Sequence, residues 1–600
     1  MASNKHHGNK ERGRKAAAMA SASDEAQRVD AETKPHAGVE VSRSDDSTRR
    51  GLRWFWPIVG GLLLVQAFLA ADCARRWSPT HDEYWHLPIG VFYWQTADWR
   101  VDPINPPLVR MWASLPLVVG GVGLELPEKS GWPDRVPMAE EVGDAFHDQH
   151  AESYRQHFFL ARLMMIPLGT MAGLLLVIWA RQWFGESAGL LAAMLWVTCP
   201  TVLAHSSLVA HDLPATLGAF ATVAACVYWQ SRPTWKRACL WGTMLGLALL
   251  TKLTVAFILP VCIAIWVILP KSVFITKRKE IVWQIFAGLF MTWLVLSLQF
   301  FALGVLPAPY LAEWEALREV LTVKHPVFLN GEWNSEGFRS YYLWAFIWKL
   351  PLAMLVCLML AMAFVVRKSR IVGEGEGKNL LWRRNLLLMT GVAVFVIPAS
   401  LSGNQLGIRY VLPAFPFLML FAAQAAGWWQ KISPQWMNVV GVILIACMPL
   451  SLRQHPDHLA YFNLLAGGST GGLDRLSDSN LDWGQDLYRL QEYLDANEIE
   501  LSTLAYFGSV RPWKIGLTQD APAAYTPAAG WHAVSANYVQ GRPHALRLPD
   551  GSYRAVNLDE FGYFRFFEPV EKIGGSMFLY QLSEEDVERY VEVRERMRGS

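Results

Sequence analysis

The sequence predicts an all-α polytopic membrane protein that carries a small α/β domain at its C-terminal end. Of the 600 residues, 52% are hydrophobic and only 18% are charged, whereas a soluble chain of this length forms several domains with more charge. The hydrophobic residues also form blocks of roughly 18–25 residues, the length that crosses about 30 Å of hydrocarbon. These blocks end near residue 452, and a more polar composition follows.

Residues 1–50 are rich in Lys, Arg, Ser, Asp and Ala and contain no apolar run. A segment of this composition cannot bury enough apolar surface to fold, so we predict a disordered cytoplasmic tail. No short apolar core follows the initial charges, which argues against a cleaved signal peptide. The first apolar block is therefore interpreted as an uncleaved anchor, and residues 51–452 as the transmembrane domain.

About eleven apolar segments are interpreted as membrane spans. They lie near 54–74, 159–180, 187–204, 212–230, 237–251, 253–270, 281–306, 342–366, 385–401, 410–428 and 435–452. Basic residues gather in the loops on one side of these spans, and such an excess is typical of cytoplasmic loops. The N-terminus is thus expected in the cytoplasm. The loops 75–158, 205–211, 307–341 and 402–409 are expected outside the membrane.

The first outer loop contains two further apolar stretches, at 83–96 and 108–119, on either side of Asn105-Pro106-Pro107. Aromatic and aliphatic residues are frequent there, a pattern that suits helices that lie in the membrane interface. An ordinary belt of Trp and Tyr at the lipid headgroups is the simpler explanation for any single aromatic residue.

Residues 453–600 are predicted to form an extracytoplasmic α/β domain. Residues 485–497 have helical periodicity, 501–507 and 577–582 are typical of strands, and 584–597 form a charged helix. The seven cysteines lie in or beside apolar segments before this domain. That distribution argues against a disulfide framework or a cysteine-based zinc site, and small buried fillers are the expected role.

Polar groups from distant parts of the chain gather on the predicted outer face. They are Asp82-Glu83 after the first span, His205 and His211-Asp212 at the fourth, Lys252 between the fifth and sixth, Arg409-Tyr410 at the tenth, and Lys349 at the eighth. Placing a charged side chain at the edge of the hydrocarbon layer costs free energy unless the side chain snorkels, pairs, binds a cation or takes part in chemistry. Carboxylates beside fixed cations suit group transfer from an anionic lipid. A carboxylate removes a proton from an acceptor hydroxyl, and the cations stabilise a departing phosphate.

Each of these residues also has an ordinary structural interpretation. Asp82 would cap the helix that begins near Glu83, or pair with Arg75 or Arg76. His211-Asp212 would likewise cap a helix N-terminus, and Lys252 and Arg409 would snorkel toward headgroups.

The order of these motifs along one polytopic chain resembles the GT-C fold glycosyltransferases that depend on polyprenyl phosphate, the group that includes protein O-mannosyltransferases and the lipid A aminoarabinose transferase, family 39. The sequence resembles a bacterial membrane-protein branch more closely still. Its motifs are matched here by Phe328-Leu329-Asn330-Gly331-Glu332, Lys349-Leu350-Pro351, Gly407-Ile408-Arg409-Tyr410 and the acidic turn from Asp478 to Asp486. The resemblance covers roughly residues 54–452 and is carried by short motifs in a specific order.

The resemblance implies a membrane enzyme that transfers a hexosyl or pentosyl group, with inversion, from a polyprenyl-phosphate carrier to an extracytoplasmic protein, glycan or lipid acceptor. The expected location is the bacterial inner membrane. The expected partners are the lipid-linked sugar, membrane lipids and the acceptor, and no nucleic acid. No cofactor is certain, although a divalent cation held by Asp82 and Glu83 would fit some family members.

The resemblance also implies roles for individual residues. Asp82 would be the general base, Glu83 its helper, and Asp212 a second carboxylate at the acceptor or metal site. Lys252, Arg409 and Lys349 would contact the donor phosphate. His211, Tyr410, Trp333, Asp482 and Trp483 would face the acceptor or the sugar, with Trp483 carried toward the membrane by the acidic turn.

Three other functions remain open at this point. A transporter or lipid flippase also places charges in spans, but no repeat-related halves are found in the sequence. A non-catalytic glycan-assembly protein would act through its outer domain. An enzyme similar to an O-antigen ligase, with a diphosphate donor, would depend on Arg and His rather than on the Asp-Glu pair.

Overall fold

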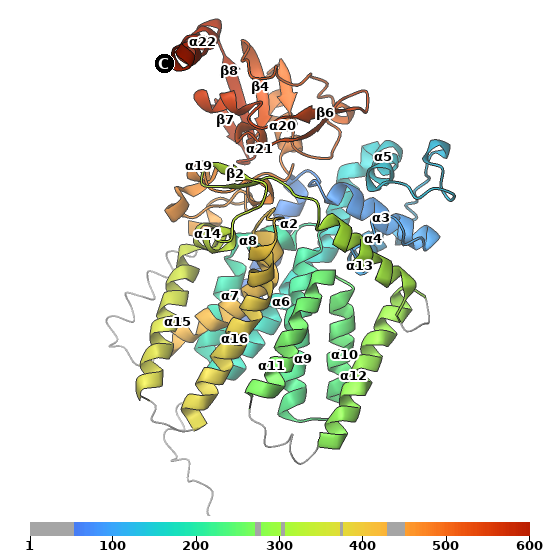
Figure 1. Ribbon diagram of the computed structural model, residues 1–600, viewed down its shortest axis with the longest axis vertical. Coiled ribbons are helices and arrows are strands. Elements are labelled where there is room, and N and C mark those ends of the chain that lie inside the picture. The colour runs from blue at the N-terminus through green and yellow to red at the C-terminus, as the bar shows by residue number, and fades with distance from the viewer. Residues whose placement is uncertain (1–52, 270–277, 302–305, 372–375, 429–449, 600) are drawn as a thin grey trace, which may run out of the picture. The chain divides into compact units, whose positions relative to one another are not determined.

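The computed structural model describes residues 53–269, 278–301, 306–371, 376–428 and 450–599. Long helices run side by side in the lower part of Figure 1, and the C-terminal strands lie at one end of them. The bundle consists of α2 (Phe55–Arg76), α6 (Tyr154–Phe184), α7 (Glu186–Val197), α8 (Pro200–Ser206), α9 (Asp212–Ser231), α10 (Trp235–Leu249), α11 (Leu259–Ile268), α12 (Arg278–Gln299), α14 (Tyr341–Lys349), α15 (Leu352–Ile371), α16 (Glu376–Leu401) and α17 (Phe415–Ala422).

The polytopic membrane fold predicted from the sequence is confirmed. Six helices in the described part of the chain are long and apolar enough to cross a membrane, or up to seven when the bent pair α7 and α8 counts as one span. The predicted number of eleven is not confirmed. Two of the predicted spans correspond to helices of only 15 and 10 residues, α10 and α11, and most of the segment 435–452 lies outside the described residues. The number and orientation of the spans remain predictions.

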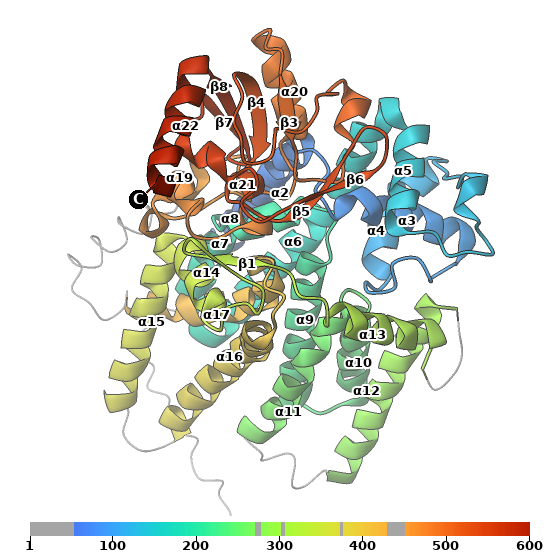
Figure 2. The same ribbon diagram turned by 45° about the horizontal axis from the view of Figure 1, so that its top comes forward.

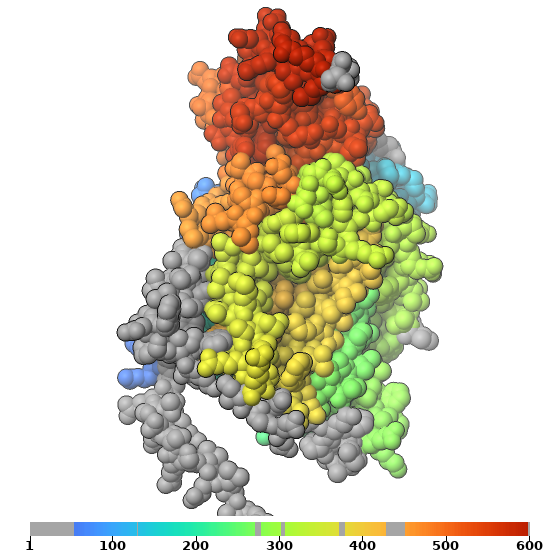
Figure 3. Space-filling model, turned by 60° about the vertical axis from the view of Figure 1, so that its left-hand side comes forward, coloured from blue at the N-terminus to red at the C-terminus, as the bar shows by residue number. Residues whose placement is uncertain are grey.

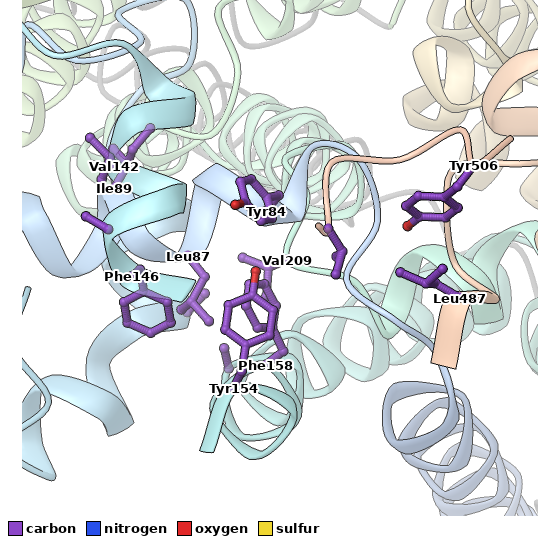
Figure 4. Close-up of a cluster of buried hydrophobic side chains, with 14 of the residues drawn as sticks. Tyr84, Leu87, Ile89, Val142, Phe146, Tyr154, Phe158, Val209, Leu487 and Tyr506 are labelled. Carbon is purple, nitrogen blue, oxygen red and sulfur yellow. The ribbon is translucent and has the colours of Figure 1, made fainter. Parts of the chain in front are cut away.

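Two helices of the loop between α2 and α6 have the bounds predicted from the sequence, α3 (Glu83–Thr96) and α4 (Leu108–Val119). The same loop contains a third helix, α5 (Ala139–Gln149). Most of α3 is buried by protein, because α4 and α5 pack against it. Figure 4 shows Tyr84 and Leu87 of α3 beside Phe146 of α5 and Tyr154 of α6. The apolar surface of α3 therefore forms part of a protein core.

The C-terminal domain contains a four-stranded sheet in the order β3-β4-β8-β7, made of β3 (Thr503–Ala505), β4 (Gly530–Ser535), β7 (Glu571–Ile573) and β8 (Met577–Leu582). β3 is parallel to β4, and the other neighbours are antiparallel. The predicted helices are present as α20 (Leu487–Ala496) and α22 (Glu584–Gly599). Short elements complete the domain: α19 (Gly468–Gly472), α21 (Ala536–Val539), and the hairpin of β5 (His544–Arg547) and β6 (Tyr553–Val556).

The C-terminal domain packs directly on the bundle. The backbone amide of Ser78, after α2, donates to the carbonyl of Gln485, and that of His81 donates to the carbonyl of Trp483, both at 2.8 Å. The loop between α12 and α14 contributes α13 (Ala308–Val320) and the hairpin of β1 (Val327–Leu329) and β2 (Glu332–Asn334). Figures 2 and 3 show this hairpin region between the bundle and the C-terminal sheet. The segments that carry the predicted site thus meet at one end of the helices.

Candidate functional site

Four of the predicted site residues form one charged cluster at this end of the bundle. Arg409 Nη1 donates to Asp82 Oδ2 at 2.9 Å and lies 3.7 Å from Asp212 Oδ2. Lys252 Nζ donates to the other Asp212 oxygen at 2.6 Å. Residues separated by up to 327 positions therefore share a single site. We call these four residues the charged cluster.

Breaks in regular structure position these side chains. Asp82 precedes α3, Asp212 is the first residue of α9, and Lys252 lies in extended backbone between α10 and a 3₁₀ turn (Leu253–Ile258). Arg409 lies in another 3₁₀ turn (Ile408–Ala414) that leads into α17. Such breaks at the ends of spans allow side chains from several helices to converge.

One simpler role is observed, since Asp212 lies in the first turn of α9, where the helix dipole favours a negative charge. The other simpler roles are not observed. The Asp82 side chain makes no capping hydrogen bond to α3, and Arg76 pairs with Asp72 instead. The charged ends of Lys252 and Arg409 are held by carboxylates, so neither side chain is a free snorkelling cation. The Asp212 side chain is 2% exposed and that of Asp82 is 23% exposed. Asp82 is thus the carboxylate more open to an incoming group.

Arg409 is also fixed by aromatic and hydroxyl contacts. Its Nε donates to Ser479 Oγ at 3.1 Å, and its guanidinium lies 4.2 Å from the ring centroid of Trp483. Tyr410 lies between the two cations, with its ring 5.1 Å from Arg409 and 5.1 Å from Lys252. A guanidinium over an aromatic face gains cation–π attraction, which is strongest when it is desolvated.

Glu83 has a different environment from its neighbour Asp82. It is fully buried and pairs with the buried Arg162 through two hydrogen bonds of 2.9 and 2.6 Å. Its oxygens also accept hydrogen bonds from the Thr80 amide and hydroxyl and from the Val209 amide. Both oxygens of Glu83 are therefore already used in holding the loop before α3 against α6 and the segment before α9.

This donor set does not fit a divalent ion shared by Asp82 and Glu83. Both oxygens of Glu83 accept charge-assisted or backbone hydrogen bonds, and one oxygen of Asp82 faces Arg409. A hard cation needs free carboxylate oxygens and would be repelled by the two guanidinium groups. The metal role that the resemblance offers for this pair is therefore not supported by the hydrogen bonding of the two carboxylates.

The acidic turn is held by the other family motifs, and Asn480 is its centre. The Asn480 side chain accepts from the Ile408 amide at 2.9 Å and donates to the Tyr341 hydroxyl at 2.8 Å. Lys349 Nζ donates to the Asn480 carbonyl at 2.6 Å and to the Leu459 carbonyl at 2.8 Å. The contacts of Lys349 are thus with the turn, and none of them is with the charged cluster in the described part of the chain.

Gly407 is required where the turn meets the Arg409 segment. Its φ is +143°, and a Cβ at this position would lie 2.3 Å from Ser479 Oγ. Ser479 in turn donates to the carbonyl of Leu406. The absence of a side chain at 407 therefore allows Ser479 to reach Arg409.

The remaining predicted residues lie around the cluster rather than in it. His211 stacks edge-on against His86 with ring centroids 4.6 Å apart, and His86 accepts from Arg110. Trp333, in the hairpin β1–β2, donates through its indole nitrogen to the Gln540 carbonyl at 3.2 Å. Trp483 is 2% exposed, so its ring supports Arg409 and is not open to a sugar.

Asp482 belongs to the interior of the turn. Its Oδ1 accepts from the Gly484 amide at 3.0 Å, and its backbone carbonyl accepts from the Asn537 side chain at 2.9 Å. Burial raises the pKa of Asp482 to about 8, because the charged form loses its hydration and only partly regains it from the neighbouring donors. Asp482 is therefore a protonated structural group at neutral pH.

A second group of polar residues lies where His81, the residue before Asp82, meets the C-terminal domain. The His81 ring stacks on Phe507 with centroids 5.8 Å apart and lies 5.8 Å from the His544 ring. Burial lowers the pKa of both histidines, which keeps both imidazoles neutral. Arg542 pairs with Asp478 at 2.6 Å, while its Nε and Nη1 have no hydrogen-bond partner among the described residues.

An apolar cavity of about 900 Å³ runs along α9, the helix that begins with Asp212. Pro214 and Thr251, which line it, are close in sequence to Asp212 and Lys252. The lining continues along α9 as far as Ser231, which corresponds to about 25 Å of helix at about 1.5 Å per residue. Helices α4, α6 and α10 supply the other walls.

Several residues of this site were not predicted from the sequence. Arg162 lies within a long apolar helix and Arg542 lies outside the motifs identified in the sequence, whereas Ser479 and Asn480 belong to the acidic turn but were given no role of their own. A charged residue within an apolar span is itself a signal for Arg162, since such residues are rare unless paired. Asn480 belongs to the acidic turn, but its partners are visible only in the structure.

Comparison with known proteins supports the class predicted from the motifs. Residues 154–326 match the family model described as dolichyl-phosphate-mannose-protein mannosyltransferase. The matched segment includes Asp212, Lys252 and the cavity walls α6, α9 and α10, whereas Asp82 and Arg409 lie outside it. The resemblance to a membrane glycosyltransferase of this type is thus confirmed for that part of the chain.

Two solved structures are also similar to this chain. The crystal structure of ArnT from Cupriavidus metallidurans bound to undecaprenyl phosphate has 15% identity and a TM-score of 0.44, covering 68% of this chain and 69% of that chain. The same protein in the apo state has 15% identity and a TM-score of 0.42, covering 66% of this chain and 63% of that chain. No curated protein matches the sequence.

Proposed function

We propose that this protein transfers a sugar from a polyprenyl-phosphate carrier to an acceptor hydroxyl outside the cytoplasm, with inversion at the anomeric carbon. The observation that carries the proposal is the charged cluster, together with a long apolar cavity whose lining includes Pro214 and Thr251, close in sequence to Asp212 and Lys252. A lipid-linked phosphosugar has an apolar tail, an anionic phosphate and a polar sugar. The apolar cavity matches the tail, and the charged cluster matches the phosphate. The family model over residues 154–326 supports the same donor class.

The charge balance of the cluster supports a phosphate ligand. Asp82 and Asp212 are matched by Arg409 and Lys252, so the cluster has no net charge when all four groups are ionised. A phosphodiester brings one negative charge and competes with Asp82 for Arg409. Asp212 is the more buried carboxylate and keeps both cations oriented during this exchange. Donor binding would thus release Asp82 from its ion pair.

The released Asp82 is the proposed general base. It accepts the proton of the acceptor hydroxyl while the hydroxyl oxygen forms a bond to the anomeric carbon. The bond from that carbon to the phosphate oxygen breaks, and its electron pair stays on the polyprenyl phosphate. Arg409 and Lys252 stabilise the second negative charge that develops there. Because attack and departure occur on opposite faces, a single displacement inverts the configuration.

Glu83, Lys349 and Trp483 have positioning roles in this proposal. Glu83 and Arg162 hold the loop that carries Asp82. Lys349 holds the acidic turn, and through it Ser479 and Trp483 orient Arg409. His81, the residue before Asp82, is proposed to line the acceptor side together with His544 and Arg542, which lie around the same Phe507 ring.

The direct test is transfer of label from radiolabelled polyprenyl-phosphate sugars to envelope extract by the purified protein. Asp82→Asn should lower the transfer rate by about 10²–10⁴, the usual contribution of a positioned base. Asp98→Asn is the matched control, because Asp98 pairs with Arg100 in the same loop and should leave transfer unchanged. Equal transfer by wild type and Asp82→Asn would refute the base assignment. Movement of the lipid across vesicles without any transfer would favour a flippase.

A further inference from the structure

A group of metal-binding side chains lies outside the charged cluster, where α2 meets the segment after the last span. It consists of Cys73, His455 and His458, and one ligand atom from each lies within 4.8 Å of the other two. Cys73 and His458 are buried, and His455 is partly exposed. Two elements separated by 382 residues in the sequence thus bring one sulfur and two imidazoles together.

The distances between these atoms match those of a tetrahedral metal site. His455 Nδ1 lies 3.0 Å from His458 Nε2 and 3.9 Å from Cys73 Sγ. Zinc bonds of about 2.3 Å to sulfur and about 2.0–2.1 Å to nitrogen place tetrahedral ligands about 3.3 Å apart for two nitrogens and about 3.6 Å apart for sulfur and nitrogen. The two observed separations differ from these by a few tenths of an ångström.

The neighbouring Asp72 fixes the orientation of His455. Asp72 Oδ2 lies 2.9 Å from His455 Nε2, so the Nε2–H group donates a hydrogen bond to the carboxylate. That tautomer leaves the lone pair on Nδ1, the atom that faces Cys73 and His458. Carboxylates hold metal-binding histidines in this manner, which fixes the tautomer and makes the ligand more basic.

His458 supplies the third side chain of the group. Its Nε2 faces His455 Nδ1, while its buried Nδ1 has no hydrogen-bond partner among the described residues. The site therefore offers one thiol and two imidazoles.

We propose that Cys73, His455 and His458 bind one borderline-soft divalent metal ion of the zinc type, with Asp72 as the outer partner of His455. Thiol and imidazole ligands select zinc over magnesium or calcium, which prefer oxygen. The ion would join α2 to the segment that leads into the C-terminal domain. Three protein ligands leave a fourth position for water or an exogenous ligand. A single cysteine with distant histidines forms no zinc motif, so the site is not evident from the sequence alone.

The experiment uses the full-length protein purified in detergent, stripped with chelator and reloaded with Zn²⁺ or Co²⁺. We expect one ion per chain, a thiolate-to-cobalt charge-transfer band, and a sulfur neighbour at about 2.3 Å in the zinc absorption spectrum. Reloading should raise Tm, and chelator should reverse the increase. Cys73→Ala should remove the band and the increase in Tm, whereas Cys357→Ala, at another buried free cysteine, should keep both.

Wild-type protein without a sulfur neighbour around the bound metal would overturn the proposal. So would equal metal content in wild type, Cys73→Ala and His458→Asn, since the metal would then be held elsewhere. A protein that binds no metal after reloading would show that the three side chains form only a hydrogen-bonded relay. The zinc absorption spectrum of the wild-type protein tests for the sulfur ligand even if a variant fails to fold.

Discussion

Arg409 is the residue that contacts both the carboxylates of the proposed site and the acidic turn. It contacts Asp82 and lies near Asp212, and it is held by Ser479 and Trp483 of the acidic turn. A guanidinium stays charged at any accessible pH and offers several donors in one plane. It therefore suits a group that exchanges a carboxylate for a phosphate.

Lys252→Met tests the phosphate clamp at the residue scale. Methionine keeps most of the volume but removes the charge that now faces Asp212 and is proposed to face the donor phosphate. We expect donor affinity to fall by about tenfold or more, since hydrogen bonds to charged groups contribute about 1.5–3 kcal/mol. Equilibrium binding of a non-transferable donor analogue measures this. Unchanged affinity would exclude Lys252 from the phosphate site.

Glu83→Gln separates the structural carboxylate from the proposed catalytic one. The change leaves Arg162 buried without its charged partner, which costs about 3–5 kcal/mol in comparable buried pairs. Thermal unfolding in detergent should show a large loss of stability, whereas Glu152→Gln at an exposed position should show almost none. A stable variant that retains its fold but loses transfer would assign Glu83 a direct chemical role instead.

At the scale of the element, the acidic turn and the Arg409 segment pack closely together, and this packing positions Arg409. Gly407→Ala introduces a Cβ 2.3 Å from Ser479 Oγ at a φ of +143°, so either the turn or the 3₁₀ segment must shift. We expect a loss of about 1–3 kcal/mol in stability and a lower kcat/KM.

Gly403→Ala is the control for that substitution. It lies in the same loop, and the nearest atom would be 3.5 Å from the new Cβ, an ordinary contact. This variant should change stability by less than about 0.5 kcal/mol. Equal effects of the two substitutions would mean that the close approach at 407 does not position Arg409.

The same turn predicts a pH dependence of stability. The pKa of Asp482 is about 8 in the folded protein, well above its ordinary value, so folding favours the protonated form. The stability contributed by that proton is complete below about pH 4 and is lost as pH rises toward 8. Asp482→Asn, which is neutral at all pH values, should therefore lose less stability than wild type between about pH 5 and about pH 8. Parallel Tm curves for the two proteins would contradict this.

At the scale of the whole molecule, the apolar cavity is the proposed path of the lipid tail. Ala221→Leu adds three carbon atoms to the cavity wall on α9. KM for a long-chain donor should rise by roughly tenfold, because a tail excluded from the cavity loses apolar burial worth about 1–2 kcal/mol. KM for a donor with a very short tail should change little. An equal rise for both donors would place the tail elsewhere.

Much of this architecture could be predicted from the sequence. Apolar block length identified the membrane fold, and the bounds of α3 and α4 followed from their apolar stretches and the intervening Pro-Pro pair. The charged cluster was predictable because charges next to hydrocarbon are costly unless they pair or function, and Asp82, Asp212 and Arg409 all fall on the same predicted face.

The rest depended on contacts that no local pattern encodes. Glu83 and Asp82 look equivalent in the sequence, and only the position of Arg162, 79 residues away, distinguishes their roles. From the sequence, Lys349 was expected to contact the donor phosphate. In the structure its amino group instead donates to two backbone carbonyls. Trp483 was expected to face a sugar, but the turn that carries it folds back beneath Arg409.

The central claim is that the donor phosphate takes Arg409 from Asp82 and thereby frees the base. The most direct test measures donor affinity and single-turnover transfer together in Asp82→Asn and Arg409→Met. Asp82→Asn should bind donor at least as tightly as wild type while transferring sugar about 10²–10⁴ more slowly, and Arg409→Met should lose affinity. Loss of donor affinity in Asp82→Asn, or transfer at the wild-type rate, would contradict the account.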